Sequence, residues 1–178
     1  MFYINKDEEY LNLVNDILSN DEFNKLNYII HHGISRFNHS LKVSYYSYKI
    51  TKLLHLNYRN VARGGLLHDF FLSSNDRSDK EMFIDTFTHP KRALKKADET
   101  FYLNDMEKDI IIGHMFPFYK TAPKYVESWI VNITDTVIGT YELLFQYCLN
   151  LNYAINYLYL FIFVNLANNL FTFVKTSI

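Results

Sequence analysis

The chain has 178 residues, which suits one domain with a substantial buried core. Its 18 basic and 19 acidic residues nearly cancel, so the composition argues against the basic surface of a duplex nucleic-acid binder. A single cysteine, Cys148, excludes a disulfide framework, and the N-terminus lacks the basic and apolar segments of a signal peptide, so we expect a cytoplasmic location.

Apolar residues recur at three- and four-residue spacing along most of the chain, and this pattern predicts an all-α fold. No alternating run bounded by hairpin turns is present, so we expect no substantial sheet. The polar residues 73–79 are expected to form a loop. In chain order, the expected helices cover approximately residues 11–18, 21–30, 35–54, 58–70, a helix that begins at residue 90, 104–114 and 125–147.

Two local signals predict where helices begin. Pro90 suits the first position of a helix, where its missing N–H would be unpaired in any case, so His89 is expected just before that helix. Asn104 followed by Glu107 has the pattern of a capping box, which predicts the start of a helix that runs to His114.

The segment Leu143–Val174 contains no charged residue over 32 positions. This length would allow a transmembrane helix, but seven side-chain amides interrupt the segment, and the longest stretch without one is Tyr157–Val164. Because unpaired polar groups are costly in hydrocarbon, a membrane span is disfavoured. We expect instead a helix that packs on the domain or that forms a homodimer through this segment.

Six residues with metal-binding side chains lie in or beside the expected helices. Imidazole and carboxylate groups both bind divalent transition metals, and a carboxylate can bridge two ions whereas an imidazole cannot. Two of the six are adjacent, and because neighbouring residues on a helix point about 100° apart, both can reach one site only at a helix end. The six are His39, His68, Asp69, His89, His114 and Asp135.

The order and local contexts of these six residues resemble the HD-domain superfamily of metal-dependent phosphohydrolases, over about residues 37–142. Gly65-Leu66-Leu67-His68-Asp69 is similar to the superfamily's small-apolar-apolar-His-Asp helix. Thr88-His89-Pro90-Lys91-Arg92-Ala93 is similar to the His-Pro-x-x-Ala/Gly helix start of dinuclear members. Ile111-Ile112-Gly113-His114 resembles the segment of the fourth histidine, and Val131-Asn132-Ile133-Thr134-Asp135 resembles the helix of the last ligand.

Three further segments resemble a small uncharacterised bacterial subfamily of HD proteins. They are Leu67-His68-Asp69-Phe70-Phe71-Leu72, His114-Met115-Phe116-Pro117 and Pro123-Lys124-Tyr125-x-Glu127. The chain departs from that subfamily at Thr136, where a lysine usually follows the last aspartate. This departure removes a side chain that would contact phosphate, and it leaves the expected metal ligands unchanged.

The resemblance implies a compact single-domain helical bundle of the HD type. Residues 1–34 would be N-terminal helices that pack on the core, 35–147 the metal-binding core, and 148–178 an apolar helix or helices of the same domain. It also implies two divalent metals that share Asp69, of which Mn or Fe suit these donors best, with Zn, Ni, Co and Mg less suited. The first metal would be held by His39, His68, Asp69 and Asp135, and the second by Asp69, His89 and His114.

With this ligand set, the resemblance implies a phosphohydrolase whose catalytic residues are Asp69 and His68. The substrate would be a phosphate ester of a small metabolite, with a nucleotide as the first expectation, and a hydroxide bridging the metals would attack phosphorus. Two alternatives stay open: a mixed-valence di-iron oxygenase on the same scaffold, and a metal-binding sensor with little turnover. Glu127 is a candidate proton relay, and the candidates for substrate contact are Arg92, Lys124, His32 and Arg36.

Overall fold

The computed structural model describes residues 4–31, 33–72 and 79–176. Over these residues the expected all-α class is confirmed, because the only sheet is an antiparallel pair of two-residue strands. The chain divides into two compact units, Met1–Thr140 (unit 1) and Tyr141–Ile178 (unit 2). The described elements are η1 (Ile4–Lys6), α1 (Glu8–Leu18), α2 (Asp21–Asn24), η2 (Lys25–Tyr28), β1 (Ile30–His31), β2 (Ile34–Ser35), α3 (Arg36–Leu53), α4 (Tyr58–Leu67), α5 (Asp79–Thr100), α6 (Asp105–Gly113) and α7 (Val126–Thr176).

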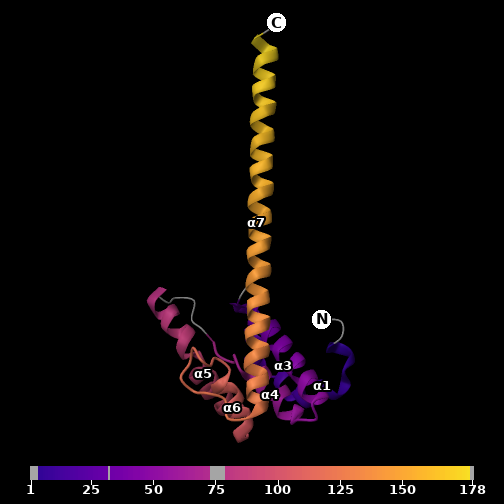
Figure 1. The fold of residues 1–178 in the computed structure, drawn as a ribbon, viewed down its shortest axis with the longest axis vertical. Helices are drawn as coiled ribbons and strands as arrows, with labels where there is room; N and C mark the ends of the chain where they lie inside the picture. The colour runs from indigo at the N-terminus through magenta and orange to yellow at the C-terminus, as the bar shows by residue number, and fades with distance from the viewer. Residues whose placement is uncertain (1–3, 32, 73–78, 177–178) are drawn as a thin grey trace. The chain divides into compact units, whose positions relative to one another are not determined.

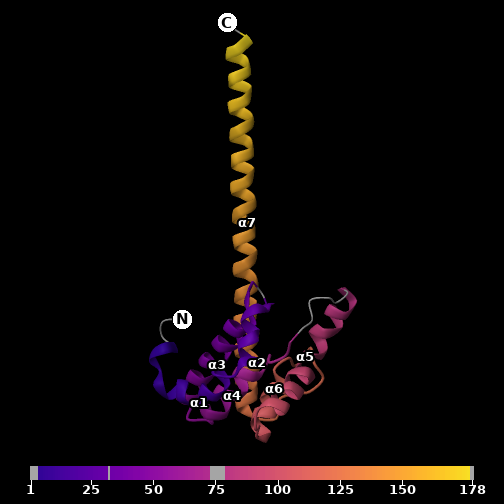
Figure 2. The same cartoon turned by 180° about the vertical axis from the view of Figure 1, so that it is seen from behind.

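Helix α4 is the central element of unit 1. It contacts α1, α3 and α6, and α5 packs against α6. Figures 1 and 2 show α1 and α3 on one side of α4, and α5 and α6 on the other. The C-terminal end of α4, where His68 and Asp69 lie, is therefore surrounded by helices that can supply further ligands.

Two glycines allow α4 to approach its neighbours closely. A Cβ atom added at Gly65 would lie 3.1 Å from the backbone Cα of Ser44 in α3, and one added at Gly64 would lie 2.9 Å from the side chain of Ile110 in α6. The α3–α4 contact is also held by a hydrogen bond of 2.6 Å from Ser44 Oγ to the carbonyl of Ala62. Small residues at these positions therefore bring the His-bearing ends of three helices together.

Helix starts follow the sequence signals where a side chain caps the backbone. Ser35 Oγ accepts a hydrogen bond from the N–H of Asn38 at the start of α3. At the start of α6, Asn104 and Glu107 form both hydrogen bonds of a capping box, so this prediction is confirmed. These caps satisfy N–H groups that have no partner within the helix.

Two predicted helix boundaries in unit 1 are wrong. Helix α5 begins at Asp79 and contains Pro90, so His89 lies inside the helix and not before it. A proline inside a helix removes one backbone hydrogen bond, and here the helix continues on both sides of it. The helix expected over 21–30 ends at Asn24 and gives way to η2, where Asn27 Nδ2 donates to the carbonyl of Asn24 and so competes with the helical pattern. Of the loop expected over 73–79, residues 73–78 lie outside the described residues.

Unit 2 consists of the C-terminal part of α7. The helix expected to end near Tyr147 continues without a break to Thr176. The sequence contains no glycine or proline after Gly139, so none of the usual stop signals is present. Over its described residues, 141–176, unit 2 is therefore a single helix without a second element to form a core.

Candidate metal centre

Three of the expected ligands meet where α3, α4 and α7 come together in unit 1. His39 lies in the first turns of α3, His68 follows the last residue of α4, and Asp135 lies on α7. Asp135 Oδ1 is 2.9 Å from His39 Nε2 and 3.6 Å from His68 Nε2. Three donor atoms within 4.8 Å of one another form a group that could hold a metal ion.

A second group forms around Asp69. Its Oδ1 lies 3.3 Å from His89 Nε2 and 3.7 Å from His114 Nε2, and these two ring nitrogens are 3.0 Å apart. Its other oxygen, Oδ2, lies 4.0 Å from His68 Nε2. The structure therefore brings all six expected ligands together, and the two oxygens of Asp69 face different histidines.

Backbone carbonyls fix the orientation of two of these rings. His68 Nδ1 donates to the carbonyl of Gly65 (2.7 Å), and His114 Nδ1 donates to the carbonyl of Ile111 (2.8 Å). A neutral imidazole that donates from Nδ1 has its lone pair at Nε2, which is the arrangement of a metal-binding histidine. His68 Nε2 is buried and makes no hydrogen bond to any described residue.

Burial and neighbouring groups keep two of the donors, His114 and Asp135, in their metal-binding protonation states. Burial, together with the nearby His68 and His89, lowers the pKa of His114 from 6.5 to about 3, so its ring is neutral at pH 7. Burial raises the pKa of Asp135, but His68 and a hydrogen bond from His39 outweigh this effect and lower it from 3.8 to about 2. The neutral ring of His114 and the ionised carboxylate of Asp135 are the forms that a divalent cation binds.

These observations fit a metal site. Five of the six donor residues are buried and Asp135 is partly buried, their donor atoms lie close together, and a buried nitrogen of His68 has no hydrogen-bond partner among the described residues. A buried polar atom without a partner is costly, and a cation would satisfy it. The buried His and Asp groups of unit 1 could therefore hold a metal ion.

Arg36 and Phe71 form the wall of the site beside Asp69. The Arg36 side chain is buried, its Nε lies 3.8 Å from Asp69 Oδ2, and its Nη1 donates to the carbonyl of Phe71 (2.7 Å). Its guanidinium also lies 3.9 Å from the centroid of the Phe71 ring, which stacks on His89 at 5.3 Å. In the structure, Arg36 contacts Asp69 and the chain segment that follows it.

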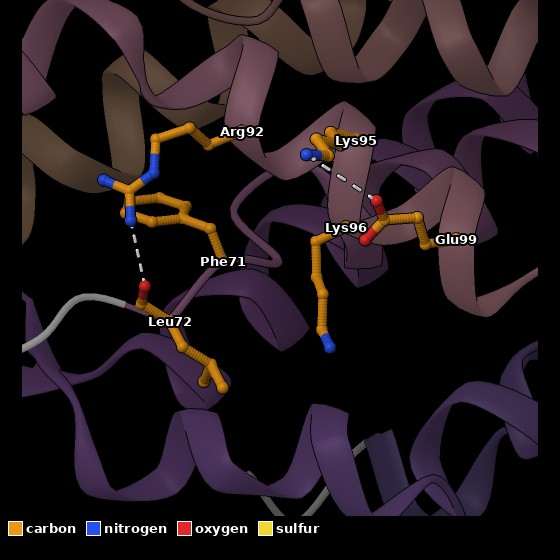
Figure 3. Close-up of a pocket in the computed structure, with 6 residues that line it drawn as sticks. All are labelled: Phe71, Leu72, Arg92, Lys95, Lys96 and Glu99. Carbon is orange, nitrogen blue, oxygen red and sulfur yellow. Dashed lines mark hydrogen bonds and ion pairs between the residues drawn. The ribbon is translucent and has the colours of Figure 1, made fainter.

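A basic pocket of about 370 Å³ borders this wall (Figure 3). The Arg92 guanidinium lies 5.0 Å from the centroid of the Phe71 ring, and its Nη2 donates to the carbonyl of Leu72 (3.0 Å). Lys95 and Lys96 also line the pocket. Since Phe71 contacts both the pocket and His89, the pocket lies beside the second ligand group.

The other expected site residues lie elsewhere or are not described. Lys124 is exposed and lines a different pocket, together with Lys108 and Asp109. Glu127 accepts a hydrogen bond from the N–H of Asn57, at the opposite end of α4 from His68, so we assign it no role in the centre. His32 lies outside the described residues.

Two residues near the ligands were not singled out from the sequence. Asn132 Nδ2 donates to the carbonyls of His114 (2.6 Å) and Phe116 (2.8 Å) and so ties α7 to the end of α6. Its position three residues before Asp135 places both on one helix face, which was the available signal. Phe71 stacks on His89, and its closeness in sequence to Asp69 was the only signal for it.

Comparison of the chain with models of known protein families, with curated proteins and with solved structures found no match. Function is therefore inferred from the side chains of the centre and from the pocket beside it.

Proposed function

We propose that the protein is a metal-dependent phosphohydrolase that cleaves a phosphate ester of a small metabolite, with a nucleotide as the first candidate. The observation that carries this proposal is the position of Asp69, whose Oδ1 faces His89 and His114 while Oδ2 faces His68. A carboxylate placed between two groups of donors suits two cations that share it. Mn or Fe fit the nitrogen and oxygen donors best, ahead of Zn, Ni, Co and Mg.

Divalent cations in such a site would supply Lewis acidity, which lowers the pKa of a water ligand and offsets charge on a phosphoryl group. The contribution of the chain is to hold the donors in place. Carbonyls orient the rings of His68 and His114, and Asn132 fixes the end of α6 against α7. Arg36 adds a buried positive charge beside Asp69.

The basic pocket supports an anionic substrate. Three cations, Arg92, Lys95 and Lys96, line it with one carboxylate, Glu99. Lys95 pairs with Glu99 at 3.8 Å on the surface, an interaction weak enough for a phosphate to compete with. The volume of about 370 Å³ lies at the lower end of the range for small-molecule sites, which favours a substrate of about nucleotide size.

The order of the six ligands also supports hydrolysis, because it resembles that of the HD superfamily. We place the unit that carries them in the cytoplasm, in line with the near-neutral charge and the single cysteine.

The deciding experiment measures metals and turnover on one preparation. Full-length protein is stripped with a chelator, reloaded with Mn²⁺ or Fe²⁺, and assayed for phosphate release from nucleoside mono-, di- and cyclic phosphates. We expect about two metals per chain and release from at least one substrate. Iron with O₂ uptake and no phosphate release would select the oxygenase, and tight binding without product would select the sensor.

The basic pocket has its own test. Replacing Arg92 with Gln is expected to raise KM about tenfold, because a hydrogen bond to a charged group contributes roughly 1.5–3 kcal/mol, while metal content stays unchanged. The matched control is Lys91→Gln, since Lys91 is exposed and does not line the pocket. Equal KM values for the two variants would remove Arg92 from the substrate site.

A further inference from the structure

In the part of unit 2 that the structure describes, the chain forms no core of its own. It is one helix, and its described large apolar side chains from Leu143 to Val164 are between 41% and 73% exposed, except Leu149, which is partly buried. An apolar surface of this extent on a soluble protein marks a contact with another apolar phase or molecule. What covers this helix follows from how its apolar residues are distributed.

The apolar surface goes all the way round the helix. Tyr157–Val164 is eight consecutive apolar or aromatic residues, which is more than two turns, and all eight are at least 45% exposed. An amphipathic helix that packs on a protein has one apolar stripe and a polar face. A second copy of the helix would cover one face and leave the others in water. Hydrocarbon covers all faces at once.

The length of the uncharged segment matches a bilayer. The part of α7 from Val126 to Val164 is, by length and composition, long enough and apolar enough to cross a membrane, and within it Leu143–Val164 has no charged residue. These 22 residues rise about 33 Å, close to the roughly 30 Å of a hydrocarbon core. We propose that Leu143–Val164 crosses a lipid bilayer and anchors the protein to it.

Four of the seven amides that disfavour a span in the sequence have partners in the structure. Gln146 Nε2 donates to Asn150 Oδ1, and Asn156 Nδ2 donates to Asn152 Oδ1, each at 3.4 Å along the helix. All four amides of Leu143–Val164 belong to these two pairs. Pairing within the helix reduces the cost of placing polar groups in hydrocarbon. This inference does not depend on the proposed hydrolase activity.

The first test is lipid association. Full-length protein is purified in detergent, mixed with phosphatidylcholine, freed of detergent and floated on a density gradient in alkaline carbonate. We expect the wild-type protein to float with the vesicles. Leu158→Lys with Phe161→Lys should abolish flotation, because two charges in mid-span oppose insertion. The control pair is Tyr102→Lys with Phe118→Lys, which are exposed positions of unit 1 and should not change flotation. Wild-type protein that stays in the lipid-free fractions, as a dimer or larger assembly, would overturn the proposal.

The second test measures how fast a cysteine placed in the proposed span reacts with a water-soluble reagent. Cys148 lies in the proposed span, and Ala154 lies at its middle. In a Cys148→Ser background, Ala154→Cys should react with a membrane-impermeant maleimide about tenfold more slowly in vesicles than after detergent is added, because hydrocarbon excludes the reagent. Tyr102→Cys in the same background should react in intact vesicles. Fast labelling of Ala154→Cys in vesicles would overturn the span, even if the protein binds their surface.

Discussion

The two units have the same secondary structure and opposite chemistry. Unit 1 buries polar side chains, including His39, His68 and His114, and orients the last two with backbone carbonyls. Unit 2 has no ionisable carboxylate, imidazole or basic group from Leu143 to Val174, and its described apolar side chains are exposed, apart from the partly buried Leu149. A helical sequence pattern alone therefore does not distinguish a unit that holds a metal centre from one proposed to cross a membrane. What separates them is whether polar groups are buried and oriented, which requires several helices to meet.

The largest expected effect is at the residue where the ligand groups of unit 1 meet. Asp69→Ala should lower phosphate release at least about 100-fold and reduce metal content, since loss even of groups that only orient ligands costs 10–100-fold. Helical content should stay near that of the wild type. The measurements are metal analysis, turnover and circular dichroism on one sample.

The matched control for this variant is Asp98→Ala. Asp98 is an exposed carboxylate that pairs with Lys108 at 2.7 Å, outside the ligand groups. It should leave metal content and turnover unchanged. Turnover of Asp69→Ala above about a tenth of wild type would contradict the bridging role.

The second prediction concerns the pH dependence of stability, which arises from groups in unit 1. The pKa of His114 is about 3 in the folded chain against 6.5 when it is free, so the unfolded chain binds more protons between these values. The stability of metal-free protein should therefore be complete above pH 6.5 and fall by up to about 5 kcal/mol as pH drops towards 3. Below pH 3.8, protonation of Asp135, whose folded pKa is about 2, lowers it further.

Urea unfolding in the presence of a chelator, at pH 7.5 and pH 5.0, measures this slope. In His114→Gln the titrating group is gone, so the difference between the two pH values should shrink. The uncharged segment of unit 2 has no group that titrates in this range, so it should add nothing to the slope. An identical slope in wild type and variant would contradict the assignment to His114.

The third prediction tests the close packing that places the site. Gly65→Ala would bring a Cβ to 3.1 Å from the Ser44 backbone, and overpacking of this kind costs about 1–3 kcal/mol. The gain in helix propensity of about 1 kcal/mol offsets part of it, so we expect a net loss of about 1 kcal/mol in unfolding free energy. Arg59→Ala, on an exposed position of the same helix, should change stability by less than about 0.5 kcal/mol. A Gly65→Ala protein as stable as this control would show that α3 can move aside.

The smallest expected changes in unfolding free energy come from replacing one side-chain amide in each unit. Asn104 caps α6, and Asn104→Ala should cost about 1 kcal/mol of unfolding free energy. Among the described residues, Asn156 bonds to Asn152 within its own helix, and Asn156→Ala should cost at most about 0.5 kcal/mol. Thermal unfolding of both variants in the same detergent buffer measures the difference. Equal costs would mean that the amide of unit 2 has a partner outside its helix.

The sequence by itself determined the helical class and much of the site. Apolar spacing and capping residues predict α3, α4 and α6 closely, because these signals act within a few residues. It also determined which six side chains could bind metal, and the structure brings all six together. The run of uncharged residues after Glu142 was visible in the sequence as well.

Only the tertiary structure decided how these residues act. Helix α5 continues through Pro90, which local preference for a helix start does not predict. Arg36 is buried against Asp69, whereas Lys124 is exposed in a different pocket, although both are basic residues near ligands in the sequence. Ring orientation depends on carbonyls, and the protonation of His114 depends on burial among other rings. These properties arise from groups far apart in the chain, and no local pattern encodes the distance between them.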